Sequence, residues 1–288
     1  MAKLLIIADR KKRSIAIQRG LELAHKLQCS VDVVAFCHTS LRPLRLKAQE
    51  RAAIKKRLLG EREAEVQQLI ERHKVGEQKV SLVPVWEKDI ASWVIRRCAR
   101  PYEAVVKTGH RTESFTYTST DWQLLRECPH PVLIVADKKW HKTKPVLATV
   151  DLASRVPEKV ALNHAVIAKA KLYAAALETQ LLIVTAIEVP TLLADLDLID
   201  PAAYVGEIKA EIKPRIKRYA ESHELPESLF RVRKGPIAKV ISSDAAKHKA
   251  QLVIIGTVGR RGITARLLGN TAESVLRHLR TDVLAIKG

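Results

Sequence analysis

The chain has 288 residues, of which 47% are hydrophobic, so it can fill the cores of two ordinary domains and is not a disordered tail. Its apolar runs are shorter than the roughly 18 residues that a membrane-crossing helix needs, and the opening MAKLLIIADRKKR lacks the features of a signal peptide, so we expect a cytoplasmic protein without a membrane span. The formal net charge of +19 favours encounters with anions, but it does not by itself define a binding site.

The first half of the chain alternates short apolar runs with longer helical patterns. It opens with the strand pattern KLLIIAD, which ends in Asp9. The elements predicted after it are a helix at 14–28, a strand at 31–38, a helix at 46–74, a strand at 80–86, a helix at 89–100, a strand at 104–107, and a last helix and strand within 122–137. Apolar runs of this length between helical patterns favour buried parallel strands.

The second half repeats the same order. Its first strand pattern, PVLATVD, ends in Asp151 as the earlier one ends in Asp9. The elements that follow are a helix at 157–178, a strand at 181–189, a helix at 200–223, a strand at 229–234, a helix at 236–249, a strand at 252–256, and a last helix and strand within 273–288. Asp200 followed by Pro201 predicts the start of the second of these helices, as N-cap and first helical residue.

This alternation predicts an α/β protein built from two tandem Rossmann-like domains, each a five-stranded parallel sheet flanked by helices. We expect the first domain at residues 1–140 and the second at 145–288, joined by the polar, basic stretch KKWHKTK. The positive charge is uneven, because residues 1–144 carry 29 basic and 16 acidic side chains whereas the second half carries 21 and 15.

The stretch GTVGRRGITARLLGNTAESV, at 256–275, joins the fourth strand of the second half to its last helix. Gly256 and Gly259 can take positive φ and leave room for close backbone approach, so such a turn can aim several N–H groups at one anion. The arginines that follow can reach outer phosphates or remain solvated. The loop matches neither a Walker A sequence nor GxGxxG, and from geometry alone it is either a phosphate cradle or a flexible corner.

A helix start follows this loop. Asn270 or Thr271 can cap it, with Glu273 positioned as in a capping box, and a helix N-terminus favours phosphate. In an open parallel sheet, ligands bind beyond the carboxyl ends of the strands where the strand order reverses. Asp151 and the loop that begins at Gly256 therefore face one crevice if the first and fourth strands are neighbours.

At these residues the sequence resembles the universal stress protein family. The family loop reads glycine, two residues, glycine, nine residues, glycine and a small polar residue, and Gly256, Gly259, Gly269 and Asn270 fit that spacing. The preceding LVIIGT, the following AESVLRHLRTDVLAIKG and the stretch KGPIAKVI also resemble the family's usual surroundings. The likeness covers the whole chain and is stronger in the second half.

The resemblance implies a stress-response protein. It also implies nucleotide binding, because many family members bind ATP or a related nucleotide, and we expect such a nucleotide to be bound together with Mg²⁺. It implies that Asp151 meets the adenosine end of the nucleotide and that the loop meets the phosphates. The implied nucleotide-binding residues are Asp151, Gly256, Thr257, Gly259, Arg260, Gly269, Asn270 and Thr271. Two positions where the family often has a hydroxyl are Asn270 and Ala272, which leaves ATP, AMP and an unrelated anion as alternatives.

The first half lacks a comparable loop. KTGHRTESFTYTSTDW stands in its place and contains a single glycine, Gly109, although Lys107 and the residues after Gly109 keep it basic. We therefore predict that domain 1 is a degenerate universal stress protein domain without a triphosphate cradle.

Other functions have weaker support in the sequence. No base–nucleophile pair or metal-ligand spacing stands out, so we expect no metal site and at most slow ATP hydrolysis. The leucine-rich TLLADLDLID, at 191–200, is interpreted either as a short segment packed on the core or as a lid over a lipid-like or apolar anionic ligand. Nucleic acid is disfavoured because only 4% of residues are aromatic. A homodimer is compatible with the sequence, and the four cysteines are interpreted as reduced thiols.

Overall fold

The computed structural model describes residues 2–10, 14–109, 119–137, 140–257 and 269–288. These residues form two units, Met1–Asp137 and Lys138–Gly288. The division falls at the beginning of the polar stretch that separates the two repeats in the sequence.

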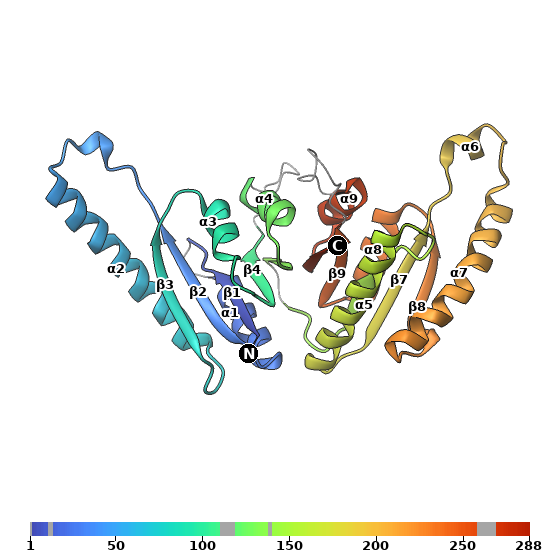
Figure 1. Cartoon of the computed structure of the whole chain (residues 1–288), viewed down its shortest axis with the longest axis horizontal. Coiled ribbons are helices and arrows are strands. Elements are labelled where there is room, and N and C mark those ends of the chain that lie inside the picture. Colours follow the sequence, from blue (N-terminus) through green and yellow to red (C-terminus); the bar gives the residue numbers. More distant parts are fainter. Residues whose placement is uncertain (1, 11–13, 110–118, 138–139, 258–268) are drawn as a thin grey trace. The chain divides into compact units, whose positions relative to one another are not determined.

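Unit 1 is a doubly wound parallel sheet. Its elements are β1 (Lys3–Ile7), α1 (Ile15–Lys26), β2 (Ser30–Cys37), the 3₁₀ turn η1 (Arg42–Leu44), α2 (Ala48–His73), β3 (Val80–Trp86), α3 (Ile90–Arg97), β4 (Ala104–Thr108), α4 (Ser119–Glu127) and β5 (Val132–Val135). The strands run parallel in the order β3-β2-β1-β4-β5. Helices α1 and α2 pack together on one face, and α3 and α4 pack together on the other (Figure 1).

Unit 2 has the same plan. Its elements are β6 (Val146–Thr149), α5 (Pro157–Ala176), β7 (Leu181–Ile187), α6 (Thr191–Asp195), α7 (Pro201–His223), the 3₁₀ turn η2 (Glu227–Leu229), β8 (Phe230–Lys234), α8 (Ile237–Lys247), β9 (Leu252–Thr257), α9 (Asn270–His278) and β10 (Asp282–Lys287). The order is β8-β7-β6-β9-β10, again parallel. The predicted pair of Rossmann-like domains is confirmed.

The central strands form because their side chains are apolar on both faces. Leu4, Leu5 and Ile6 of β1 are fully buried, as are Val146 and Leu147 of β6. Such continuous hydrophobic runs are what a sheet covered by helices on both faces requires. Burial of the core therefore fixes the strand register, which in turn places the residues that follow each strand.

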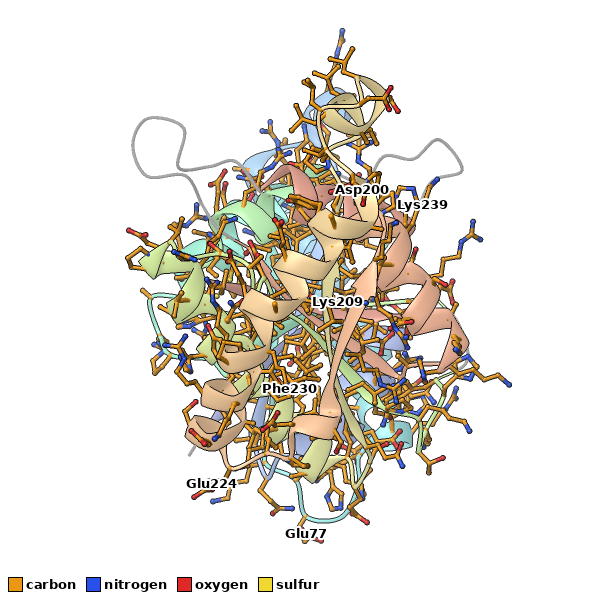
Figure 2. The ribbon with its side chains drawn as sticks, turned by 90° about the vertical axis from the view of Figure 1, so that its right-hand side faces the viewer. Glu77, Asp200, Lys209, Glu224, Phe230 and Lys239 are labelled. Carbon is orange, nitrogen blue, oxygen red and sulfur yellow. The ribbon has the colours of Figure 1, made fainter. Side chains whose placement is uncertain are left out.

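Helix α7 begins where the sequence predicts. Asp200 occupies the N-cap and its carboxylate accepts a hydrogen bond from the backbone N–H of Ala203 at 2.6 Å, and Pro201 is the first helical residue. Figure 2 shows the helix extending between Asp200 and Glu224. Glu224 ends it in the left-handed conformation, with φ of 53°. The predicted start of this helix is confirmed.

The strand order reverses between β1 and β4 in unit 1 and between β6 and β9 in unit 2. In unit 2, Thr149 is paired with Ile255. Asp151 and Thr257 each come two residues after this pair, so they lie at the carboxyl ends of adjacent strands. The condition for a shared ligand edge, that the first and fourth strands be neighbours, is met.

Two further features of the described ranges bear on the sequence expectations. No helix in them is both long enough and apolar enough to cross a membrane. The four cysteines are thiols outside any disulfide: Cys29, Cys98 and Cys128 are buried and Cys37 is partly exposed.

Candidate functional site

Asp151 is held firmly by its backbone while its carboxylate stays accessible. Its N–H donates to Oδ1 of Asn163 at 3.0 Å, and Nδ2 of Asn163 donates back to its carbonyl oxygen at 2.9 Å. The carboxylate accepts from Lys159 Nζ at 3.0 Å and from the N–H of Ser154 at 3.2 Å, yet the side chain remains 49% exposed. A carboxylate has about four lone-pair positions, so this one retains capacity to accept hydrogen bonds from a ligand.

Gly256 lies inside β9 and does not have a positive φ. The expectation of a left-handed turn at this residue is therefore wrong. A Cβ placed on Gly256 would lie 2.7 Å from both Cγ and Cδ2 of Leu162 on α5. The absence of a side chain here allows Leu162 to pack directly on the strand.

Thr257 turns its side chain into the fold. It is buried, and its hydroxyl donates to the carbonyl oxygen of Ile286 on β10 at 3.1 Å. This hydrogen bond joins two neighbouring strands. The hydroxyl of Thr257 is therefore occupied, and the residue offers a ligand little beyond its place at the end of β9.

The start of α9 differs from the sequence prediction in its cap. Gly269 is the N-cap residue and supplies no side-chain hydrogen bond, so Asn270 and Thr271 are the first two helical residues rather than the cap. Thr271 is exposed. Gly269 itself offers no side-chain acceptor to the first N–H groups of the helix, and N–H groups at such a position suit an anion. Gly259 and Arg260 lie outside the described residues.

Unit 1 presents the same position in a closed form. Asp9 is only 7% exposed, and its Oδ2 accepts from the hydroxyls of Thr108 at 2.6 Å and Ser14 at 3.2 Å. Arg62 donates to its backbone carbonyl. Lys107, expected to keep this region basic, is instead buried in an ion pair with Asp121 at 2.5 Å.

The strand registers explain this contrast. Ile6 pairs with Val106 in unit 1 and Ala148 pairs with Ile254 in unit 2, so Thr108 in β4 corresponds to Gly256 in β9. Where unit 2 has a glycine, unit 1 has a threonine whose hydroxyl occupies its aspartate.

Helix α5 also differs from α1 at the matching position. α1 begins at Ile15 and α5 at Pro157, so Gly20 of α1 corresponds to Leu162 of α5. The larger side chain is on the strand in unit 1 and on the helix in unit 2. In unit 2, Leu162 packs on Gly256, whereas in unit 1 a Cβ on Gly20 would meet Ile6 and Val106.

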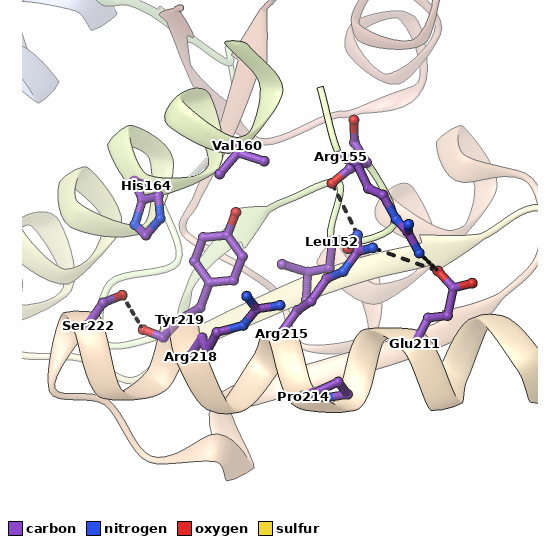
Figure 3. A pocket seen from close by; sticks show the side chains of 11 residues that line it. Leu152, Arg155, Val160, His164, Glu211, Pro214, Arg215, Arg218, Tyr219 and Ser222 are labelled. Atoms are coloured by element: carbon purple, nitrogen blue, oxygen red, sulfur yellow. Dashed lines mark hydrogen bonds and ion pairs between the residues drawn. The ribbon is translucent and has the colours of Figure 1, made fainter. Parts of the chain in front are cut away.

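A separate cavity of about 670 Å³ lies between α5 and α7 in unit 2 (Figure 3). Sequence reasoning did not predict it, and its lining includes none of the predicted site residues, although Leu152 lines it directly after Asp151. The leucines of 191–200 do not line it either. Leu192, Leu196 and Leu198 are 59–69% exposed, so that segment is a short helix that is not packed on the core.

The fold is that of a tandem, doubly wound α/β protein. The aspartate after the first strand is exposed in unit 2 and buried in unit 1. Residues 142–287 match the model of the universal stress protein family. The alignment with universal stress protein E of Escherichia coli K12 is 32% identical and covers 84% of this chain and 79% of that protein. A homologue of that protein in Haemophilus influenzae is 27% identical, over 99% of this chain and 96% of its own length. The chain belongs to the universal stress protein family.

Solved structures support the same fold. A putative universal stress protein from Pseudomonas aeruginosa UCBPP-PA14 matches with a TM-score of 0.73 at 23% identity, covering 100% of this chain and 93% of its own. A universal stress protein from Archaeoglobus fulgidus matches with a TM-score of 0.64 at 17% identity, covering 99% and 98%. At these identities the likeness concerns the fold of the whole two-unit chain.

Proposed function

We propose that the chain is a cytoplasmic stress-response regulator that binds one ATP-type nucleotide or phosphate ligand, in unit 2, and has no dedicated catalytic activity. The observation that carries the proposal is the contrast between Asp151, half exposed at the switch point, and Asp9, whose Oδ2 accepts from internal hydroxyls. A carboxylate anchored by its backbone and open at its side chain suits the hydroxyl groups of a ribose.

The phosphates would lie on the loop that follows β9. The start of α9, where Gly269 gives no side-chain cap, supplies N–H groups and the positive end of the helix dipole. Gly259, Arg260, Asn270 and Thr271 complete the proposed set through backbone approach, charge and short polar side chains. Mg²⁺ would be held mainly by the phosphates of the nucleotide, as it commonly is.

The absence of dedicated catalysis is part of the proposal. Within the described ranges, no group of three His, Cys, Asp or Glu side chains is arranged to hold a metal ion. The groups next to Asp151 are Lys159 and Asn163, which form no nucleophile–base pair with it. Turnover would then not exceed slow hydrolysis of bound ATP.

The test compares two aspartates by titration with a fluorescent ATP analogue. Asp151→Ala removes the proposed ribose acceptor and should weaken binding about tenfold or more, the usual cost of losing a hydrogen bond to a charged group. Asp195→Ala, which removes an exposed carboxylate on α6 with the same change in net charge, should leave the affinity unchanged. Equal affinities for the wild type and both variants would remove Asp151 from the site.

A further inference from the structure

The cavity between α5 and α7 has the size and composition of a ligand site. Its volume of about 670 Å³ falls within the range of about 300–1,000 Å³ that small-molecule sites usually have. Three parts of unit 2 form it: the loop after β6, the first half of α5 and the second half of α7. Figure 3 shows side chains from all three converging on the space between the two helices.

The walls of the cavity are apolar near the sheet. Leu152 and Tyr219 are buried, and Val160 and Pro214 extend the apolar surface along the two helices. The ring of Tyr219 lies 4.6 Å from that of His164, centroid to centroid, with the two planes tilted by 39°, so this wall carries two rings in contact. Such a surface suits the apolar body of a ligand.

The charges of the lining do not balance. Its guanidinium groups are Arg155, Arg215 and Arg218, and its carboxylate is Glu211. Glu211 is shared, because its Oε2 lies 3.3 Å from Arg155 Nη2 and 3.7 Å from Arg215 Nη2. Arg218 is exposed at the edge of the cavity and has no ion pair within the described part of the chain. The lining therefore has an excess of two positive charges.

Arg215 is already committed to the protein. Its Nη1 donates to the carbonyl oxygens of Leu152 and Ala153, both at 2.8 Å, and of Ser154 at 3.1 Å. Arg218 makes no such hydrogen bonds to the residues that the structure describes, which makes it the group best suited to meet a ligand's charge. An arginine at the edge of an apolar cavity matches a molecule with one anionic end.

His164 adds a polar group to the wall of the cavity. Its Nδ1 lies 2.9 Å from Nε2 of His223, an arrangement in which one ring donates and the other accepts. Burial, followed by the nearby His164 and Lys171, lowers the pKa of His223. Of the two rings, His223 is therefore the one whose protonation the fold disfavours.

We propose that this cavity is a second ligand site, for a small amphipathic anion with an aromatic or aliphatic body and one carboxylate or sulfonate group, and that Arg218 binds the anionic end. The site is independent of the nucleotide proposal, because none of its residues belongs to the nucleotide set. It also gives the lipid-like alternative raised by the sequence a definite location, distinct from the exposed leucines of 191–200.

The test uses 8-anilinonaphthalene-1-sulfonate and its neutral relative N-phenyl-1-naphthylamine, which share an aromatic system and differ in the sulfonate. Arg218→Glu should weaken binding of the sulfonate about tenfold or more. Lys217→Glu changes the net charge equally, on the preceding residue of α7, whose side chain is 67% exposed and outside the lining. It should change the affinity less than about twofold, and the neutral probe should respond to neither variant.

A third variant, Val160→Phe, fills the cavity and should weaken both probes while far-UV circular dichroism stays unchanged. Equal losses in Arg218→Glu and Lys217→Glu would reduce the effect to bulk charge and overturn the proposal. Loss of the sulfonate signal in a Leu192→Ser, Leu196→Ser, Leu198→Ser variant would overturn it as well, because the probe would then bind the exposed leucines. None of these outcomes depends on nucleotide binding.

Discussion

Gly256→Ala tests the packing of unit 2 at the strand that carries the glycine loop. The added Cβ would lie 2.7 Å from Cγ and Cδ2 of Leu162 and 3.2 Å from its Cδ1. Cγ is not the end of the side chain, so a rotation of the terminal methyl groups does not relieve the contact, and Leu162 is buried. Overpacking of this kind typically costs about 1–3 kcal/mol. Replacing glycine in a strand recovers roughly 0.5–1 kcal/mol of backbone entropy, so the middle of the two ranges leaves an expected net destabilisation of about 1 kcal/mol.

The assay is urea unfolding followed by pulsed hydrogen exchange and mass spectrometry, with peptides from β9 reporting on unit 2 and peptides from β4 on unit 1. Leu162→Ala should cost about 2–5 kcal/mol by itself. In the double variant, the methyl group added by Gly256→Ala would fill part of the space vacated by the leucine side chain. The loss should then be at least about 1 kcal/mol smaller than the sum of the two single losses. Additive losses, or no loss in Gly256→Ala, would show that Leu162 does not pack against this strand as described.

Three other measurements follow from the structure. Burial lowers the pKa of His223 below its ordinary value of 6.5, so the unfolded state binds the proton first and the stability of unit 2 should fall as pH drops through about 6.5. In urea titrations, His223→Gln should flatten this dependence of the unfolding free energy on pH, and an unchanged dependence would contradict the role of His223. Cys37 should react with a thiol reagent roughly tenfold faster than Cys98, whose hydrogen bond to Cys128 and burial raise its pKa, and equal rates would be the contrary result. Leu192→Ser, at a side chain 69% exposed, should change the unfolding free energy by less than about 0.5 kcal/mol, and a larger loss would mean that this leucine is packed.

The sequence predicted the helices and strands well at residues that have a single strong conformational preference. Asp200 and Pro201 together fix the start of α7. The Asp side chain accepts a hydrogen bond from a free N–H of the first turn, and proline has no backbone N–H that would need an acceptor there. The apolar runs of β1 and β6 could hardly be anything but buried strands between helices. The alternation of these runs with helical patterns was enough to place both sheets.

The conformation of Gly256 was missed because a glycine has two uses that look alike in a sequence. It can adopt positive φ, or it can make room for a neighbour, and only the position of Leu162 shows that the second applies. The neighbour is far along the chain, on a different element. For a related reason, the α9 cap was assigned to Asn270 or Thr271 instead of Gly269, because the sequence does not show at which residue the backbone turns helical.

The sequence around Asp9 and Asp151 also did not predict that one is buried and the other exposed. Both follow the first strand of their unit. Asp9 is bonded by the hydroxyl of Thr108 on a neighbouring strand, whereas the matching residue in unit 2, Gly256, has no side chain to make that bond. The cavity between α5 and α7 is likewise a product of two helices far apart in sequence, with Arg215 of α7 bonded to the loop after β6. Such features depend on strand register and helix spacing, which single residue patterns do not encode.

One nucleotide site per chain, in unit 2, is the claim on which the proposed function depends. Isothermal titration calorimetry with Mg²⁺ and ATP, on protein freed of bound ligand by unfolding and refolding, can decide it by comparing the wild type with Gly259→Val. We expect micromolar binding with a stoichiometry of one per chain in the wild type and no binding in the variant. Two sites per chain, equal affinity in the variant, or no heat of binding in the wild type would contradict the proposal.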